Sequence, residues 1–216
     1  MINVEGYKAI TGELSKRNVT LVAVSKIKPN EDIQALYNLG QRDFGENYVQ
    51  ELTDKAAALP TDIRWHFIGH LQSNKVKYIA PFVYLIHGID SFKLLQEINK
   101  QAAKNNRIID CLLQVHVAQE ETKFGFSIGE LPDSDALSEL KNVRVVGLMG
   151  MASNTDDEAK LHAEFKQLKQ ALDAMAITNN QMTVLSMGMS GDYKIAIEEG
   201  STMVRIGSLL FGARKA

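Results

Sequence analysis

The sequence has few of the features that mark secreted, membrane-bound or nucleic-acid-binding proteins. Among its 216 residues only Cys111 is a cysteine, which excludes an internal disulfide and suits a reducing compartment. No apolar run approaches the roughly 20 residues of a membrane span, and no basic flank precedes an apolar segment at the N-terminus. The 24 basic and 26 acidic residues are scattered, so no broad positive surface is expected. We therefore expect a cytoplasmic protein that binds neither nucleic acid nor membranes.

Proline is also scarce, with four residues, and no linker rich in Pro, Gly or Ser divides the chain. Apolar residues make up 45% of the sequence, so a chain of this length can bury a substantial core. We expect one domain that covers residues 1–216.

A short apolar run followed by a helical pattern recurs along the chain. The first run is Thr20 to Lys26 (TLVAVSK), after which Ile33, Leu36 and Leu39 share one helical face. The other predicted strands are 43–47, 64–69, 84–90, 110–117, 143–151, 183–188 and 203–207. Before the first strand, apolar residues at three- and four-residue spacing up to Arg17 predict an amphipathic helix.

Eight strands that alternate with helices predict an α/β fold, a (β/α)8 TIM-type barrel preceded by an N-terminal helix. The alternative is an open doubly wound sheet. It lacks support because no GxGxxG or GxxxxGK[ST] motif follows the first strand. Between the sixth and seventh strands, Thr155 to Glu158 resembles a capping box that opens a long helix.

The loops after the seventh and eighth strands are the expected place for a phosphate site in such a barrel. The seventh strand is followed by MSGD, with Ser190 at the start of a helix, and the eighth by Gly207 and Ser208. Glycines allow a close backbone approach, and helix N-termini offer free N–H groups to an anion. Each turn alone would be an ordinary βα connection. Their pairing in these two loops predicts a phosphate site.

Lys26 follows a run that should be fully buried, so its amine is expected either to reach the surface or to point into the barrel mouth. Partial desolvation in the mouth would lower the pKa of the amine and make it nucleophilic toward an aldehyde. Lys26, the phosphate site and Arg205 on the eighth strand are three parts of a site for pyridoxal 5′-phosphate (PLP).

Several segments carry a family resemblance that runs over nearly the whole chain. They are LVAVSKIKP, FGENYVQEL, WHFIGHLQSNK, KFGF, GLMGMA and SMGMSGDYKIAIEEGSTMVRIGSLLFG. The chain resembles the pyridoxal phosphate homeostasis proteins, which are similar to the N-terminal barrel of alanine racemase. The residue after the lysine is Ile27, where many relatives are expected to have Thr, so no side-chain hydroxyl is available at that position.

The resemblance implies roles for individual residues. Lys26 would carry PLP as a Schiff base, and Arg205 would face the pyridine nitrogen. Ser190, Gly207 and Ser208 would contact the phosphate. The remaining expected lining residues of the cofactor pocket are Asn47, His70 and Met149.

The same resemblance implies a PLP carrier or homeostasis factor without catalytic turnover. An arginine beside the pyridine nitrogen weakens the ring as an electron sink, and the chain ends at Ala216, where alanine racemase continues into a second domain. We expect PLP itself as the ligand, PLP-dependent apo-enzymes as partners, and a monomer or weak homodimer. Two alternatives stay open: a PLP-dependent amino-acid racemase-like enzyme, and a barrel enzyme that acts on a phosphorylated sugar or acid.

Other polar residues are expected to be structural. His66 and His70 have the spacing of an HExxH zinc site but lack its Glu and fall on a predicted strand, so no metal is expected. Cys111 should be a small core residue, and His87 and His116 should be hydrogen-bonded inside the barrel.

Overall fold

The computed structural model describes residues 2–118 and 124–212 and shows the predicted barrel. Eight parallel strands close in the order β1-β2-β3-β4-β5-β6-β7-β8, with β1 paired to β8. The strands are β1 Thr20–Val24, β2 Asp43–Glu46, β3 Arg64–Phe67, β4 Leu85–Ile89, β5 Ile109–Val115, β6 Val143–Gly150, β7 Val184–Ser186 and β8 Met203–Ile206. Each predicted strand is present, and each ends one or two residues earlier than predicted.

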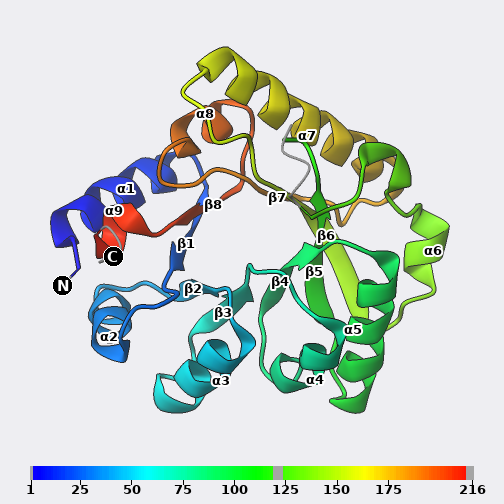
Figure 1. The fold of residues 1–216 in the computed structure, drawn as a ribbon, viewed down its shortest axis with the longest axis horizontal. Helices are drawn as coiled ribbons and strands as arrows, with labels where there is room; N and C mark the ends of the chain where they lie inside the picture. Colours follow the sequence, from blue (N-terminus) through cyan, green and yellow to red (C-terminus); the bar gives the residue numbers. More distant parts are fainter. Residues whose placement is uncertain (1, 119–123, 213–216) are drawn as a thin grey trace.

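Helices surround the ring of strands, as Figure 1 shows. The longer ones are α1 Val4–Lys16, α2 Asn30–Asn38, α3 Val49–Ala58, α5 Phe92–Lys104 and α7 Glu158–Thr178. Shorter ones are α4 Val76–Ile79, α6 Ser134–Ser138, α8 Tyr193–Glu198 and α9 Ser208–Phe211, together with 3₁₀ turns at Ser73–Lys75 and Ile128–Glu130. Within the described residues, no helix has both the length and the apolar character needed to cross a bilayer.

The apolar core has two parts because successive strand residues point to opposite faces of the barrel wall. The larger part lies between strands and helices and contains Phe44, Phe67 and Phe165, all fully buried. A smaller cluster inside the barrel consists of Val22, Leu85, Leu112, Met149 and Met203. The buried polar residues of the strands include His66, His87, Ser186 and Arg205.

The predicted N-terminal helix is present as α1 and packs beside α9, so the two ends of the described chain meet (Figure 1). Asn3 joins them. Its Oδ1 accepts a hydrogen bond from Gly6 N at 2.9 Å and caps α1, while its Nδ2 donates to Leu209 O at 3.1 Å. Its backbone N–H donates to Leu210 O at 2.7 Å.

The prediction of a capping box at Thr155 is wrong in detail. The long helix exists as α7, but Asp157 is its N-cap, and the Asp157 carboxylate accepts from Lys160 N at 3.2 Å. Thr155 instead accepts a hydrogen bond from Asp157 N through its hydroxyl. A capping box does occur at Ser127 and Glu130.

Candidate functional site

A cavity of about 330 Å³ opens where the strands end at the C-terminal side of the barrel. Val24 ends β1, and most of the other lining residues follow β2, β3, β6, β7 and β8. The lining residues are Val24, Lys26, Lys28, Asn47, Ile68, Met151, Met189, Ser190, Gly191, Arg205, Gly207, Ser208 and Gly212. The structure therefore brings six of the eight predicted site residues together, namely Lys26, Asn47, Ser190, Arg205, Gly207 and Ser208.

The turns after β7 and β8 converge on this cavity, as the sequence predicts, but Ser190 lies in the turn before α8, which begins at Tyr193, and not at the start of a helix. Gly207 N donates a hydrogen bond of 3.4 Å to Ser190 Oγ, which joins the two turns directly. The first turn is tight because Gly188 has a φ of 94°, and a Cβ at that position would lie 2.7 Å from the Ala196 Cβ. Only glycine fits this turn without strain.

The charges at the cavity favour an anion. Lys26, Lys28 and Arg205 line it, and none of the described lining residues is acidic. Lys28 Nζ donates to the carbonyl oxygens of Phe211 and Gly212 at 3.1 and 3.4 Å. Burial lowers the pKa of Arg205 to about 10, so the guanidinium stays charged at neutral pH.

Lys26 lies in a turn two residues beyond β1, whereas the sequence analysis placed it at the end of that strand. Ser25 N still donates to Gly45 O at 3.0 Å, and Lys28 N then donates back to Ser25 O, also at 3.0 Å. Ile27 has a φ of 62°, a left-handed conformation that is uncommon for a β-branched residue. Its side chain is exposed, and its N–H donates to Glu51 Oε1 at 2.6 Å.

A buried ionic cluster beneath this turn holds both neighbours of Lys26. Lys55 Nζ donates to Ser25 O and to Glu46 Oε1, both at 2.8 Å, and to Glu51 Oε1 at 2.6 Å. Ser25 Oγ donates to Glu46 Oε1. Burial raises the pKa of Glu46, although Lys55 and Ser25 oppose the rise. The cluster fixes the strained turn and with it the position of Lys26.

Arg205 is held at the inner end of the cavity by neighbouring strands. Its Nη1 donates to Ser186 O at 2.8 Å and to Ser186 Oγ at 2.7 Å, and its Nη2 donates to Gly150 O at 3.0 Å. Ser186 in turn lies against His87, whose Nδ1 is 3.0 Å from Ser186 Oγ.

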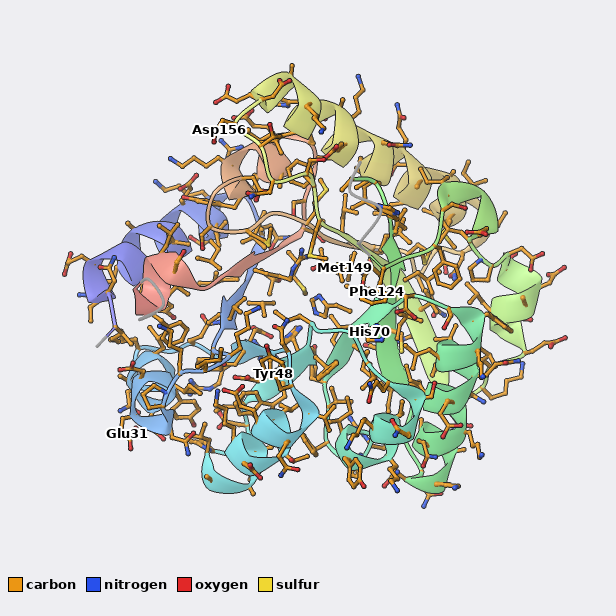
Figure 2. The ribbon with its side chains drawn as sticks, in the orientation of Figure 1. Glu31, Tyr48, His70, Phe124, Met149 and Asp156 are labelled. Carbon is orange, nitrogen blue, oxygen red and sulfur yellow. The ribbon has the colours of Figure 1, made fainter. Side chains whose placement is uncertain are left out.

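His70 and Met149 do not line this cavity. His70 Nδ1 lies 2.9 Å from Asp90 Oδ2, and its ring stacks on Phe124 with centroids 4.1 Å apart (Figure 2). These contacts hold His70 over a neighbouring hollow that also includes Asn47 and Lys75. Met149 is 1% exposed and belongs to the apolar cluster inside the barrel.

The other predictions for polar residues can be compared with their contacts. Cys111 is a buried core residue, as predicted, and burial raises the pKa of its thiol. His87 is hydrogen-bonded inside the barrel, as predicted. Within the described residues, no group of three His, Cys, Asp or Glu side chains is arranged to hold a metal ion.

The sequence analysis missed Lys28, Glu46, Lys55 and Ser186. Lys55 and Glu51 are four residues apart on α3 and resemble an ordinary surface pair. Glu46 gave a better signal, because a carboxylate inside a short buried strand requires a partner.

Comparisons with known proteins identify the family. The family described as alanine racemase, N-terminal domain, matches residues 5–215. A pyridoxal phosphate homeostasis protein from Aquifex aeolicus is 45% identical over 198 residues, which cover 90% of this chain and 87% of that protein. One from Pseudomonas aeruginosa is 41% identical and covers 91% and 85% of the two chains. The chain belongs to the pyridoxal phosphate homeostasis protein family.

Solved structures agree with this family assignment. PipY of Synechococcus elongatus without PLP is 36% identical, with a TM-score of 0.91 over 96% of this chain and 99% of that one. PipY with PLP bound is 35% identical, with a TM-score of 0.87 over the same shares. An alanine racemase from Clostridium difficile has a TM-score of 0.75 at 13% identity. The match covers 100% of this chain and 58% of the racemase. The last comparison shows a shared fold alone.

The residues of the cavity fit a phosphorylated aldehyde cofactor. Asn47 lines the cavity, and its buried Oδ1 has no hydrogen-bond partner among the described residues. A donor group of a bound ligand could supply that hydrogen bond. Two lysines and an arginine supply positive charge, and Ser190 and Ser208 supply hydroxyl groups.

Proposed function

We propose that this chain binds PLP in the cavity as a Schiff base on Lys26 and serves PLP homeostasis without catalytic turnover. The observation that carries the proposal is the meeting of Lys26 with the Ser190 and Gly207 turns in one cavity that has no acidic lining residue in the described chain. PLP supplies an aldehyde that reacts with a primary amine and a phosphate that binds backbone N–H and hydroxyl groups.

Each group of lining residues has a role in this proposal. Ser190, Gly207 and Ser208 bind the phosphate. Arg205 uses some of its N–H groups to bind Ser186 and Gly150, and its remaining N–H groups face the pyridine nitrogen. Asn47 binds a polar substituent of the ring. The solved PLP complex of PipY supports the assignment because that chain is 35% identical and shares the fold.

The absence of turnover is supported by the set of titratable groups at the cavity. The described lining residues include no tyrosine, cysteine, histidine or carboxylate, so the side chains that most often act as a second acid/base are missing beside Lys26. The Lys28 amine donates to two carbonyl oxygens. An arginine beside the ring nitrogen also weakens carbanion stabilisation by the ring.

Absorbance tests the binding. The purified chain mixed with PLP should show a visible band that is lost in Lys26→Ala and unchanged in the surface control Lys169→Ala. Pyridoxal, which lacks the phosphate, should bind at least tenfold more weakly in the wild type, and Ser190→Ala should reduce this preference. A colourless mixture, or a band that survives in Lys26→Ala, would refute the proposal.

Exchange of amino-acid α-protons in deuterium oxide tests the absence of turnover. A panel of amino acids incubated with the PLP-loaded chain should show no steady exchange. Steady exchange that is lost in Lys26→Ala would instead support the racemase-like alternative. We propose PLP-dependent apo-enzymes as recipients of the cofactor, and transfer from the loaded chain to such an apo-enzyme should restore its activity.

A further inference from the structure

A line of buried polar side chains crosses the inside of the barrel from the cavity to its opposite end. His87 Nδ1 lies 3.0 Å from Ser186 Oγ, and His87 Nε2 lies 2.9 Å from His66 Nδ1. His66 Nε2 lies 3.0 Å from Asp43 Oδ1. Both histidines and Ser186 have no exposed surface. Arg205 binds Ser186 at one end of the line.

Charged residues lie at both ends of this line. At the far end, Arg64 donates to both carboxylate oxygens of Asp43, at 2.7 and 2.5 Å. Burial alone would raise the pKa of Asp43, but hydrogen bonds from Arg64 and His66 outweigh it and hold this pKa at about 2. Asp43 is therefore ionised at neutral pH and can only accept hydrogen bonds.

The two ends fix the direction of every hydrogen bond between them. Because Asp43 only accepts, His66 must carry its proton on Nε2. Burial lowers the pKa of His66 despite the attraction of Asp43, so its ring is neutral and its Nδ1 accepts. His87 then donates through Nε2, and burial lowers its pKa well below the ordinary value, so its Nδ1 accepts from the Ser186 hydroxyl. Ser186 Oγ accepts from Arg205, which has donors only.

The reverse direction is excluded by the same two ends. If His87 donated to Ser186, His66 would place an unprotonated Nε2 against the Asp43 carboxylate. Two buried acceptors would then face each other at 3.0 Å, so His66 Nε2 would have no hydrogen bond and the carboxylate would keep only its bonds from Arg64. A second proton on either ring would place a charge in a fully buried site close to Arg64 or Arg205.

We propose that Asp43, His66, His87 and Ser186 form one directed chain of hydrogen bonds that positions the Arg205 guanidinium at the cavity. Both histidines are neutral and protonated on Nε2. The Ser186 hydroxyl donates to His87 Nδ1, and its oxygen therefore accepts from Nη1 of the arginine. Its Nε–H and the second N–H on Nη2 have no partner among the described residues, and because Arg205 lines the cavity they are available to a ligand there. This role rests on the proposed function for the identity of the ring that Arg205 faces, whereas the direction of the chain does not.

Nitrogen NMR of the histidine rings tests the direction of the chain without any cofactor. In the wild-type chain labelled with ¹⁵N-histidine, the signals of His66 and His87 should show neutral rings with the proton on Nε2 between about pH 7 and pH 8. His66→Gln and His87→Gln assign the signals. A proton on Nδ1 of either ring, or a charged ring in this range, would overturn the proposal.

Two buried serines, Ser186 at the end of β7 and Ser201 just before β8, then separate positioning from a general structural effect. Ser186→Ala breaks the chain beside Arg205. Ser201→Ala is the matched control, because Ser201 is also buried and its hydroxyl bonds only to carbonyl oxygens of Leu185, Met187 and Met203. With PLP bound, the pH midpoint of the visible band should shift by about one unit in Ser186→Ala, the size expected for one lost hydrogen bond to a charged group.

The outcomes distinguish the two proposals. If the wild type takes up PLP and both serine variants keep its pH midpoint, or shift it equally, the positioning role is wrong. If the wild type takes up no PLP, the proposed function fails, and the NMR result still decides the direction of the chain.

Discussion

Replacing Lys55 with methionine should cost the fold several kcal/mol, because Lys55 is the cation of the buried cluster beneath the Lys26 turn. Methionine keeps the apolar stem but removes the hydrogen bonds from Nζ to Ser25, Glu46 and Glu51. Removing one partner of a buried ion pair costs about 3–5 kcal/mol. Protonation of Glu46 limits the loss, because taking up a proton at pH 7 against an ordinary pKa of about 4.3 costs about 4 kcal/mol.

The pH dependence of this loss follows from the same carboxyl group. Burial raises the pKa of Glu46, and loss of Lys55 removes the main opposing attraction. Its folded-state pKa then lies further above the unfolded value, so the stability of the variant falls as pH rises above about 4.3. The difference from the wild type should therefore shrink by up to about 1.4 kcal/mol for each unit between pH 7 and pH 5.

Urea unfolding of Lys55→Met and of Lys169→Met measures the effect. Lys169 pairs with Asp173 four residues away on α7, and both side chains are largely exposed, so its loss should cost about 0.3–0.5 kcal/mol. Lys55→Met should also weaken PLP binding, since Ser25 and Ile27 flank Lys26. If the two variants differ by less than about 1 kcal/mol at pH 7, the buried cluster does not hold the turn as described.

Three further substitutions test the turns and the far end of the barrel. Gly188→Ala should lower the free energy of unfolding by about 1–3 kcal/mol, because its φ is 94° and the added Cβ would lie 2.7 Å from Ala196; Gly191→Ala, with open space at its Cβ, should be nearly neutral. Asn3→Ala should cost about 1–2 kcal/mol by thermal unfolding, since it removes the α1 cap and the bond to Leu209; equal stability would contradict this. The folded-state pKa of Asp43 is about 2, below its unfolded value, so the ionised carboxylate stabilises the fold at any pH above that unfolded value. This stabilisation is lost as pH falls toward 2. Between pH 5 and pH 2 the wild type should therefore lose about 2 kcal/mol more than Asp43→Asn, and parallel acid-stability curves would exclude this.

Local sequence signals were enough for the barrel and for one side of the site. Most strands are short apolar runs with a turn residue after them, and the common hand of βα units brings the ends of all strands to one face. Ser190, Gly207 and Ser208 could therefore be placed together without knowledge of side-chain positions. Lys26 lines the cavity although its strand ends at Val24, because a strand end and the following turn reach the same face.

Contacts across the barrel could not be predicted from the sequence. His66, His87 and Ser186 belong to β3, β4 and β7, and their meeting depends on the stagger of the closed sheet. Lys55 carried the pattern of an exposed helix residue, and its burial follows from the position of α3 against Glu46. The contacts of His70 with Asp90 and Phe124 likewise join three separate segments.

Borohydride reduction of the PLP-loaded chain, followed by peptide mass spectrometry, tests the central claim most directly. Reduction makes the bond between cofactor and lysine permanent, so the modified residue can be located. We predict one phosphopyridoxyl group per chain, on the peptide that contains Lys26, and none in Lys26→Ala at the same PLP concentration. Modification of Lys28 or of surface lysines in the wild type, with Lys26 unmodified, would contradict the account.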